Sequence, residues 1–212
     1  MSGAPFAAIV LAAGRSARMG AGRNKLVEEV GDRAIVAWVV DAFAEAGVAP
    51  ILVVTGHEAA RIGEVLSGRG CRFVRNERWS EGMGSSLACG ARALLALDQP
   101  PARGVFVCVG DLPGLRPRHV ARMIAVAEAS ATEAADRVWI PTCAGRRGHP
   151  VLFEAGWLPA LVQLAGDEGA RTLLRDRPGQ IVEIELEDAA ILRDVDTPAA
   201  LEEARRAGDR IE

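Results

Sequence analysis

The amino-acid sequence predicts a three-layer α/β fold in which helices cover both faces of a mostly parallel β-sheet. Short runs of β-type residues alternate with segments of helical periodicity through the first 130 residues, and this alternation is typical of parallel sheets with helical crossovers. Residues 6–11 and 105–109 are wholly apolar, as expected of strands that are covered on both sides. The chain has 212 residues and no internal repeat or low-complexity tract, so we expect one domain over residues 1–212.

The first 130 residues contain the most regular pattern. Apolar runs predict strands at residues 6–11, 51–55, 71–74 and 105–109. Apolar residues at helical spacing predict connecting helices at residues 35–46, 59–66, 87–95 and 117–127. Gly47 follows the first of these helices where a C-terminal cap belongs, and Pro117 suits the first turn of the last one.

The pattern becomes looser after about residue 130. Two short strands are expected at residues 138–141 and 151–153, on either side of a polar loop. Helices are expected at residues 157–165 and 170–175, followed by a strand at residues 181–186 whose alternating glutamates indicate one exposed face. Thr197 and Pro198 then predict the N-cap and first turn of a last helix.

The composition excludes several classes of function. The net charge is −3, from 25 Lys and Arg against 28 Asp and Glu, whereas proteins that coat nucleic acid carry a basic surplus. The apolar runs are too short to cross a bilayer, and no basic segment precedes the first one, which argues against a secretory signal. The four cysteines include no CxxC pair. We therefore expect reduced thiols in a cytoplasmic protein that binds neither nucleic acid nor a membrane.

The segment between the first strand and Lys25 has the composition of an anion-binding loop. Its small residues let backbone N–H groups approach a phosphate closely, and its cations offset phosphate charge. The residues concerned are Leu11, Ala12, Ala13, Gly14, Ser16 and Gly20, together with Arg15, Arg18 and Lys25. A glycine-rich turn with solvated cations has the same composition. The segment matches neither the dinucleotide-binding G-x-G-x-x-G pattern nor the P-loop.

Two carboxylates are candidates for holding a divalent cation. Asp111 follows an apolar strand and precedes a proline turn, and ligands of open α/β sheets bind at the carboxyl ends of strands. Mg²⁺ is typically held by one or two carboxylates together with substrate phosphates. Asp196 is the second candidate, although a turn and a helix start would also explain these two residues. Asp194 would share a face with Asp196 in a strand, so spacing leaves either as the second ligand.

The loop as a whole resembles the signature L-A-A/G-G-x-S-x-R-M-G…K of nucleotidyltransferases with the glycosyltransferase-A-like (nucleotide-diphospho-sugar transferase) fold. The resemblance covers almost the whole chain, because five further blocks follow in the family's order. They are N-E-R-W at 76–79 with Gly82 and S-S-L at 85–87, G-D-L-P at 110–113, G-H-P-V-L-F at 148–153, G-D-E-G-A-R at 166–171 and D-V-D-T-P at 194–198. The last three are similar to the MobA-like branch that contains molybdenum cofactor cytidylyltransferase.

The resemblance implies a role for each candidate on the nucleotide side. Lys25, Arg18 and Asp111 would take part in catalysis, and Mg²⁺ would lie on Asp111 and Asp196, which the pattern favours over Asp194. The loop residues, Lys25 and Ser86 would bind the nucleotide. Either serine of the 85–86 pair also suits capping of a predicted helix.

The resemblance further implies that an acceptor phosphate attacks the α-phosphorus of a nucleoside triphosphate and releases pyrophosphate. Positioning and charge stabilisation suffice for such a step. Residues 1–115 would bind the nucleotide and residues 116–212 the acceptor, which His149 and Arg171 would contact, although His149 also suits an ordinary surface loop. The Ala12-Ala13-Gly14 sequence is typical of cytidylyltransferases, so CTP is expected in preference to GTP, with a molybdopterin-type acceptor and a molybdenum hydroxylase as a partner.

Three alternatives remain open. The enzyme would be a guanylyltransferase, or a cytidylyltransferase for a sugar phosphate or methylerythritol phosphate, if the nucleotide or acceptor differed. A non-enzymatic maturation partner that binds molybdenum cofactor for a hydroxylase would not require both carboxylates and Lys25. A glycosyltransferase with a D-x-D motif would carry it after a central strand, whereas Asp194-Val195-Asp196 lies near the end of the chain.

Overall fold

The structure is a computed structural model that describes residues 6–20, 22–98, 101, 103–130, 136–167 and 169–208. The strands of its main sheet are β1 (Phe6–Ala12), β4 (Ile51–Thr55), β5 (Arg72–Arg75), β6 (Gly104–Val109), β7 (Val138–Cys143), β8 (Arg146–Arg147), β9 (Val151–Glu154) and β10 (Ile181–Glu185). The sheet runs in the order β10-β7-β9-β6-β1-β4-β5, and β8 pairs with β7. Strand β9 is antiparallel to β6 and β7, and β2 (Glu29–Val30) and β3 (Arg33–Ala34) form a separate hairpin.

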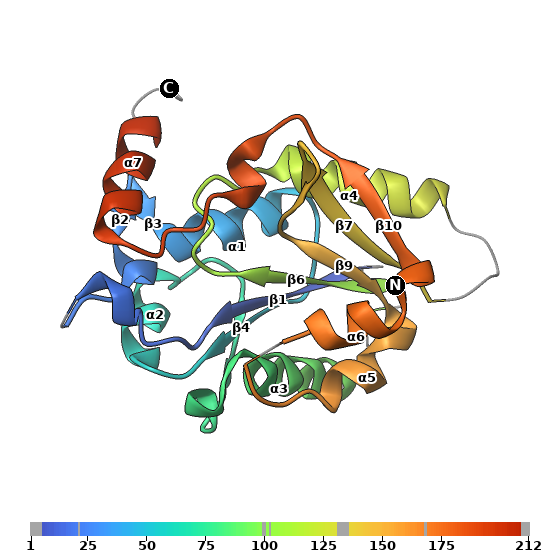
Figure 1. Ribbon diagram of the computed structural model, residues 1–212. Helices are drawn as coiled ribbons and strands as arrows, with labels where there is room; N and C mark the ends of the chain where they lie inside the picture. The colour runs from blue at the N-terminus through green and yellow to red at the C-terminus, as the bar shows by residue number, and fades with distance from the viewer. Residues whose placement is uncertain are drawn as a thin grey trace.

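Helices cover both faces of this sheet (Figure 1). They are α1 (Ile35–Glu45), α2 (Ala59–Val65), α3 (Met83–Leu95), α4 (Pro117–Ala129), α5 (Leu158–Val162), α6 (Arg171–Asp176) and α7 (Pro198–Gly208). Strand β1 shows how the layers form, because successive side chains of a strand point to opposite faces. Its Ala8 and Val10 join the core beneath α1 and α4, whereas Ala7 and Ile9 join the core beneath α3 and α5. An unbroken apolar run is therefore needed here.

The predicted three-layer α/β fold with a mostly parallel sheet is confirmed. The three predicted helix ends are also present, and Pro117 lies in the first turn of α4. The Val48 N–H donates to the Phe43 carbonyl at 3.0 Å around Gly47, whose φ is +76°, and the Ala200 N–H donates to Thr197 Oγ1 at 3.2 Å. All four cysteines are free thiols. None of the helices in the described ranges is long and apolar enough to cross a bilayer.

The structure differs from the sequence prediction in short and late elements. The hairpin β2–β3 and strand β8 have two residues per strand, which is too few for alternation to be visible in the sequence. The helix expected at residues 157–165 is shorter, since α5 ends at Val162 after a 3-10 turn over Ala155–Trp157. These elements depend on contacts across the sheet more than on local periodicity.

Parallel pairing brings the carboxyl ends of the central strands to one edge of the sheet. Leu11 near the end of β1 lies opposite Val109 at the end of β6, and the Gly110 N–H donates to the Leu11 carbonyl at 2.9 Å. The loop that follows β1 and the loop that follows β6 therefore begin side by side. This edge is where ligands of open α/β sheets bind.

Candidate active site

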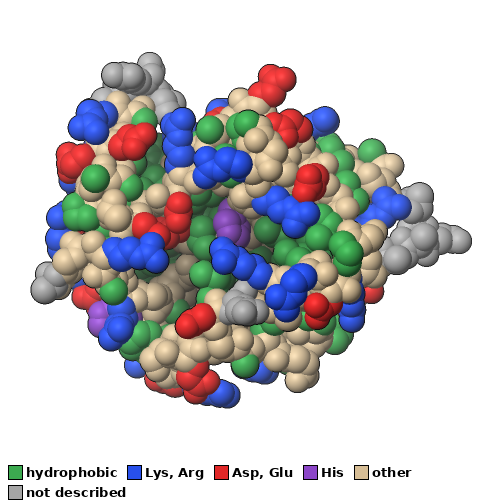
Figure 2. Space-filling model, viewed as in Figure 1, with side chains coloured by type: hydrophobic (Ala, Val, Ile, Leu, Met, Phe, Trp, Pro, Cys, Tyr) green, Lys and Arg blue, Asp and Glu red, His purple; other side chains and the backbone are tan. Residues whose placement is uncertain are grey.

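A cavity of about 490 Å³ lies at this edge of the sheet, between the loop after β1 and the start of α3. Figure 2 shows the corresponding face, which is hollowed at its centre and bordered by acidic and basic side chains. The cavity is lined by Leu11, Ala13, Gly14, Arg15, Ser16, Lys25, Leu26, Trp79, Ser80, Gly82, Met83, Ser86, Val109, Asp111 and Asp167. Eight residues predicted for the site are among them. Ala12 is buried in the core and Gly20 is exposed, and both lie outside the lining.

The loop after β1 is folded back on itself by side-chain hydrogen bonds. Ser16 adopts a left-handed conformation with φ 53°, and its Oγ accepts a hydrogen bond from the Lys25 N–H at 3.2 Å. The buried Asn24 holds Leu26 in a similar way, because the Asn24 Oδ1 accepts a hydrogen bond from the Leu26 N–H at 3.1 Å. These contacts return the chain to the end of β1. As a result, the side chain of Lys25 lies beside the carboxylate that follows β6.

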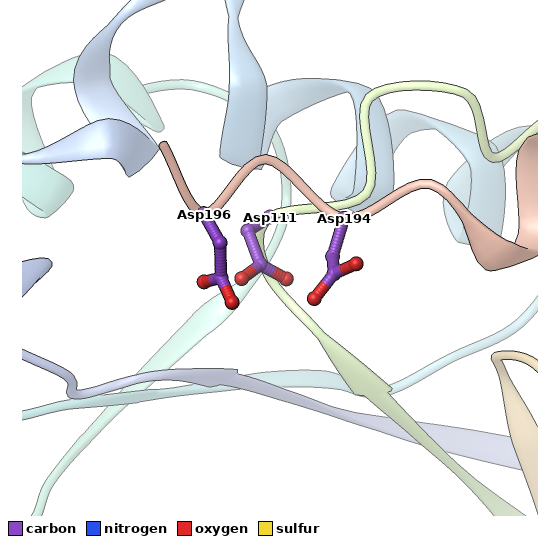
Figure 3. A group of neighbouring side chains, drawn as sticks. All are labelled: Asp111, Asp194 and Asp196. Atoms are coloured by element: carbon purple, nitrogen blue, oxygen red, sulfur yellow. The ribbon is translucent and has the colours of Figure 1, made fainter. Parts of the chain in front are cut away.

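Three carboxylates meet opposite this loop. Asp111, Asp194 and Asp196 each offer an oxygen within 4.8 Å of the others, and Figure 3 shows their side chains pointing to the same side. The Val195 N–H donates to the Asp111 carbonyl at 2.9 Å, which fixes the late segment against the end of β6. Asp194, which spacing could not separate from Asp196, is thus part of the cluster.

The carboxylate cluster fits a divalent cation. Asp111 is buried, and its Oδ1 has no hydrogen-bond partner among the described residues. A buried carboxylate oxygen without a partner is costly, and hard oxygen ligands are those that Mg²⁺ prefers. The cluster also lies beside the cavity rather than within the core, so that substrate oxygens have access to the same point.

Lys25 and Arg18 pair with two of the three carboxylates of this cluster. The Lys25 ammonium pairs with Asp111 and, at 2.5 Å, with Asp196, and Arg18 pairs with the other oxygen of Asp196. Burial opposes the charged form of Lys25, but the two carboxylates outweigh burial and raise its pKa. The hydrogen bond from Lys25 is the main cause that lowers the pKa of Asp196. Lys25 and Asp196 are therefore ionised together at neutral pH.

The two serines at the start of α3 differ in their other contacts, although both accept a hydrogen bond from Asn76. Its Nδ2 donates to Ser85 Oγ at 2.9 Å and to Ser86 Oγ at 3.1 Å. Ser85 Oγ also donates to the Gly82 carbonyl at 2.9 Å, a contact that secures the first turn of the helix. Ser86 lines the cavity, whereas Ser85 does not.

Several lining residues were not expected from the sequence. Trp79 would ordinarily be assigned to the core, but it is only half-buried and forms part of the cavity wall. Its side chain lies against Gly56, where a Cβ would come within 2.5 Å of the Trp79 Cβ, and its ring centroid is 5.4 Å from that of His57. The clue in the sequence was its position in the block that resembles a nucleobase-side segment. Asp167 lay in a block associated with the acceptor.

His149 and Arg171 lie outside the lining of this cavity. The His149 ring has a hydrogen bond to the Val107 backbone, and its Nδ1 is buried with no partner in the described part of the chain. Burial lowers the pKa of the imidazole, while Asp111 and Asp194 oppose this effect. Arg171 begins α6 and is exposed. Its positive charge lowers the pKa of His149, as burial does.

The fold, the cavity and the lysine–carboxylate cluster together define the nucleotidyltransferase class. The chain belongs to the family described as the MobA-like NTP transferase domain, which matches residues 8–183. A nucleoside triphosphate substrate is expected for this family, and divalent metals are common in it.

Known proteins are similar to the chain over most of its length. It is 30% identical to nicotine blue oxidoreductase of Paenarthrobacter nicotinovorans over 191 residues, which cover 89% of this chain and 91% of that protein. It is 28% identical to the purine catabolism protein PucB of Bacillus subtilis over 208 residues, 94% and 95% of the two chains. The solved structure of Rv0371c from Mycobacterium tuberculosis H37Rv superimposes with a TM-score of 0.80 at 25% identity, covering 97% of this chain and 100% of the other.

Proposed function

We propose that the chain is a Mg²⁺-dependent cytidylyltransferase that transfers CMP from CTP to the phosphate of a molybdopterin-type acceptor and releases pyrophosphate. The observation that carries this proposal is the convergence of Lys25, Asp111 and Asp196 beside a loop-lined cavity. Phosphoryl chemistry depends on positioned charge more than on a protein nucleophile. This cluster supplies such charge at one end of a cavity that suits a nucleotide.

Each part of the cluster has a role in the proposed reaction. Mg²⁺ bound by Asp111 and Asp196 would neutralise and orient the triphosphate. The backbone from Ala13 to Ser16 would donate N–H groups to the phosphate oxygens. Lys25 and Arg18 would move from the carboxylates to the triphosphate and stabilise the charge on the leaving pyrophosphate. The acceptor phosphate is already an anion at neutral pH, so the reaction needs no general base from the protein.

The proposal assigns residues 1–115 to the nucleotide and residues 116–212 to the acceptor. His149 supports this division, because its buried Nδ1 has no partner among the described residues and the residue lies outside the lining of the nucleotide cavity. Arg171 would add a positive charge for the acceptor phosphate. CTP is preferred to GTP because the Ala13 methyl lines the cavity and leaves less room for a purine.

The decisive experiment measures pyrophosphate release with CTP, GTP, UTP and ATP, each with and without molybdopterin. We expect acceptor-dependent release and the highest kcat/KM with CTP. Release with GTP as the best substrate would overturn the CTP assignment and leave nucleotidyl transfer intact. Release with a sugar phosphate or methylerythritol phosphate instead of molybdopterin would overturn the acceptor assignment. Binding of molybdenum cofactor without any release would favour a maturation partner.

Redox chemistry is a second candidate, because a relative that is 30% identical over most of its length is named an oxidoreductase. A redox enzyme that used a nicotinamide cofactor would not need three carboxylates beside a lysine. Oxidation of NADH or NADPH in the presence of a quinonoid dye, without pyrophosphate release from any nucleotide, would support this candidate and contradict ours.

A further inference from the structure

One carboxylate from the acceptor half reaches the nucleotide cavity. Asp167 lies shortly before α6, yet it lines the same cavity as Ser86 and Met83 at the start of α3. It belongs to a block that the resemblance associates with the acceptor. No hydrogen bond or ion pair of the Asp167 side chain is found among the described residues. Its oxygens are therefore available to a ligand.

Close packing between two glycine-containing segments fixes the position of Asp167. The Gly84 N–H donates to the Gly166 carbonyl at 2.7 Å, and a Cβ on Gly84 would lie 2.5 Å from the Ala165 carbonyl oxygen. A Cβ on Gly82, whose φ is +113°, would overlap Asp167 Oδ1. Only glycine at both positions lets the two segments come this close. The placement of the carboxylate thus follows from backbone packing and not from a flexible side chain alone.

The lining of the cavity has both charged and apolar parts. Lys25 and Asp111 mark the charged part. Besides Asp167, the lining includes the apolar residues Trp79 and Met83 and the polar residue Ser86. Asp167 lies beside the start of α3, because a Cβ on Gly82 would overlap its Oδ1. Ligand pockets of this type combine apolar walls with a few polar groups that fix orientation. A nucleobase has the matching chemistry, with flat apolar faces and polar edges.

We propose that the Asp167 carboxylate accepts a hydrogen bond from the exocyclic amino group of the nucleobase, so that this residue selects amino-bearing bases over their oxo counterparts. The inference rests on the proposed function and extends it to base selection. An ionised carboxylate only accepts hydrogen bonds. It pairs with the amino group of cytosine but faces the oxygen lone pairs of uracil at the same position. The acceptor half of the chain would thereby control the choice of nucleotide.

The test compares nucleotides whose bases carry an amino group or an oxo group at the same position, using Asp167→Asn. An asparagine amide also donates hydrogen bonds, so it tolerates an oxo group. We expect the ratio of kcat/KM for CTP over UTP to fall by about tenfold or more, because an unpaired polar group in a binding site is strongly disfavoured. If GTP proves to be the substrate, the corresponding pair is GTP and XTP, whose xanthine base carries an oxo group in place of the amino group of guanine. Asp176→Asn is the matched control, since this exposed carboxylate of α6 lies outside the cavity lining.

A second readout separates base selection from catalysis. The affinities of CMP and UMP are measured by calorimetry for wild type and both variants, without metal or acceptor. We expect Asp167→Asn to weaken CMP relative to UMP and Asp176→Asn to leave their ratio unchanged. An unchanged ratio in Asp167→Asn would overturn the inference while nucleotidyl transfer stands. A wild-type protein that bound no nucleotide at all would instead overturn the proposed function, and with it this inference.

Discussion

The two sides of the catalytic cleft differ in how their charged groups are held. On the side of the loop after β1, Lys25 is paired with Asp111 and Asp196, Arg18 with Asp196, and Ser16 holds the Lys25 backbone. On the acceptor side, the Nδ1 of His149 is buried without a partner in the described ranges, and Arg171 is exposed. One side is already organised by ion pairs in the free protein, whereas on the other side the Nδ1 of His149 has no partner among the described residues.

This difference indicates where binding must rearrange the protein. Under the proposed function, a substrate on the loop side would displace existing ion pairs, and its phosphates would replace carboxylates as partners of Lys25. Such an exchange would couple nucleotide and cation binding, because the cation and Lys25 would share the carboxylates of Asp111 and Asp196. An acceptor on the other side would gain a hydrogen bond to the unpartnered Nδ1 of His149. Substitutions on the two sides should therefore have different kinetic signatures.

The largest effect is expected from Asp111→Asn. This change replaces the buried carboxylate of Asp111 by an amide, which is a weaker ligand for the cation. We expect pyrophosphate release to fall by about 10³-fold or more at saturating Mg²⁺, with the fold retained. Steady-state assays over a range of Mg²⁺ concentrations check this, with circular dichroism as the control for folding. Wild-type activity with the same Mg²⁺ dependence would exclude Asp111 as a ligand.

Lys25→Ala should have the next largest effect, and it should lower activity while raising the affinity for a divalent cation. It removes a cation that stabilises the triphosphate in the transition state, so kcat/KM should fall by about 10²–10³-fold. It also frees Asp111 and Asp196, so Mn²⁺ should bind more tightly in the absence of nucleotide, as measured by electron paramagnetic resonance. Arg61→Ala, which removes an exposed cation paired with Glu58, should change neither quantity. Weaker Mn²⁺ binding in Lys25→Ala would contradict competition for the carboxylates.

Asp196→Asn and Asp194→Asn form a matched pair for the second carboxylate. We expect Asp196→Asn to raise the Mg²⁺ concentration needed for half-maximal activity by about tenfold, since an amide oxygen still coordinates the ion. Asp194 has no contact with Lys25, so its substitution should have a smaller effect. Titration of activity with Mg²⁺ for both variants decides between them, and the reverse order would make Asp194 the principal second ligand.

His149→Ala should affect the acceptor side alone. We expect a higher KM for the acceptor or a lower kcat, with nucleotide affinity nearly unchanged, because His149 lies outside the lining of the nucleotide cavity. Calorimetric titration with CTP and steady-state kinetics with molybdopterin separate the two outcomes. A loss of CTP affinity without any change in acceptor kinetics would place His149 on the nucleotide side.

The smallest effect concerns the scaffold of the acceptor half and appears in stability. His119 is buried, its Nδ1 accepts from the Arg116 N–H at 3.2 Å, and its Nε2 lies 2.9 Å from Asp188. Burial lowers the pKa of His119 below its usual 6.5, whereas the hydrogen bonds to Asp188 outweigh burial and lower the pKa of that carboxyl to about 2. The folded pKa of His119 therefore lies below 6.5, so that its ring is neutral at pH 7, and Asp188 stays ionised well into acid.

The sign of the pH dependence follows from these directions. Below pH 6.5 the unfolded state takes up a proton on His119 that the folded state resists, so the free energy of unfolding should fall from about pH 7 to about pH 5. The stability is complete above the unfolded pKa and is lost as the pH falls through the folded one. Denaturant unfolding at several pH values should show a shallower decline in His119→Gln than in wild type. Equal slopes would show that His119 does not contribute.

The sequence by itself determined the order of the main elements and several members of the site. Wholly apolar runs and apolar residues at helical spacing can be recognised within a short stretch of sequence. These patterns correctly predicted the positions of β1, β6 and α1 to α4. The end of an apolar strand likewise pointed to Asp111, because strand ends meet ligands in this class of fold.

Only the tertiary structure decided which distant residues meet. Lys25 and Asp196 are 171 positions apart, and their contact depends on how the segment after β10 returns to the end of β6. Three other features also depend on the tertiary structure. They are the antiparallel direction of β9, the membership of Asp194 in the carboxylate cluster, and the presence of Trp79 and Asp167 in the cavity. They arise from packing between segments far apart in the chain, such as the close approach of Gly84 to Gly166. Local periodicity carries no information about such contacts, since it reports only which face of an element is buried.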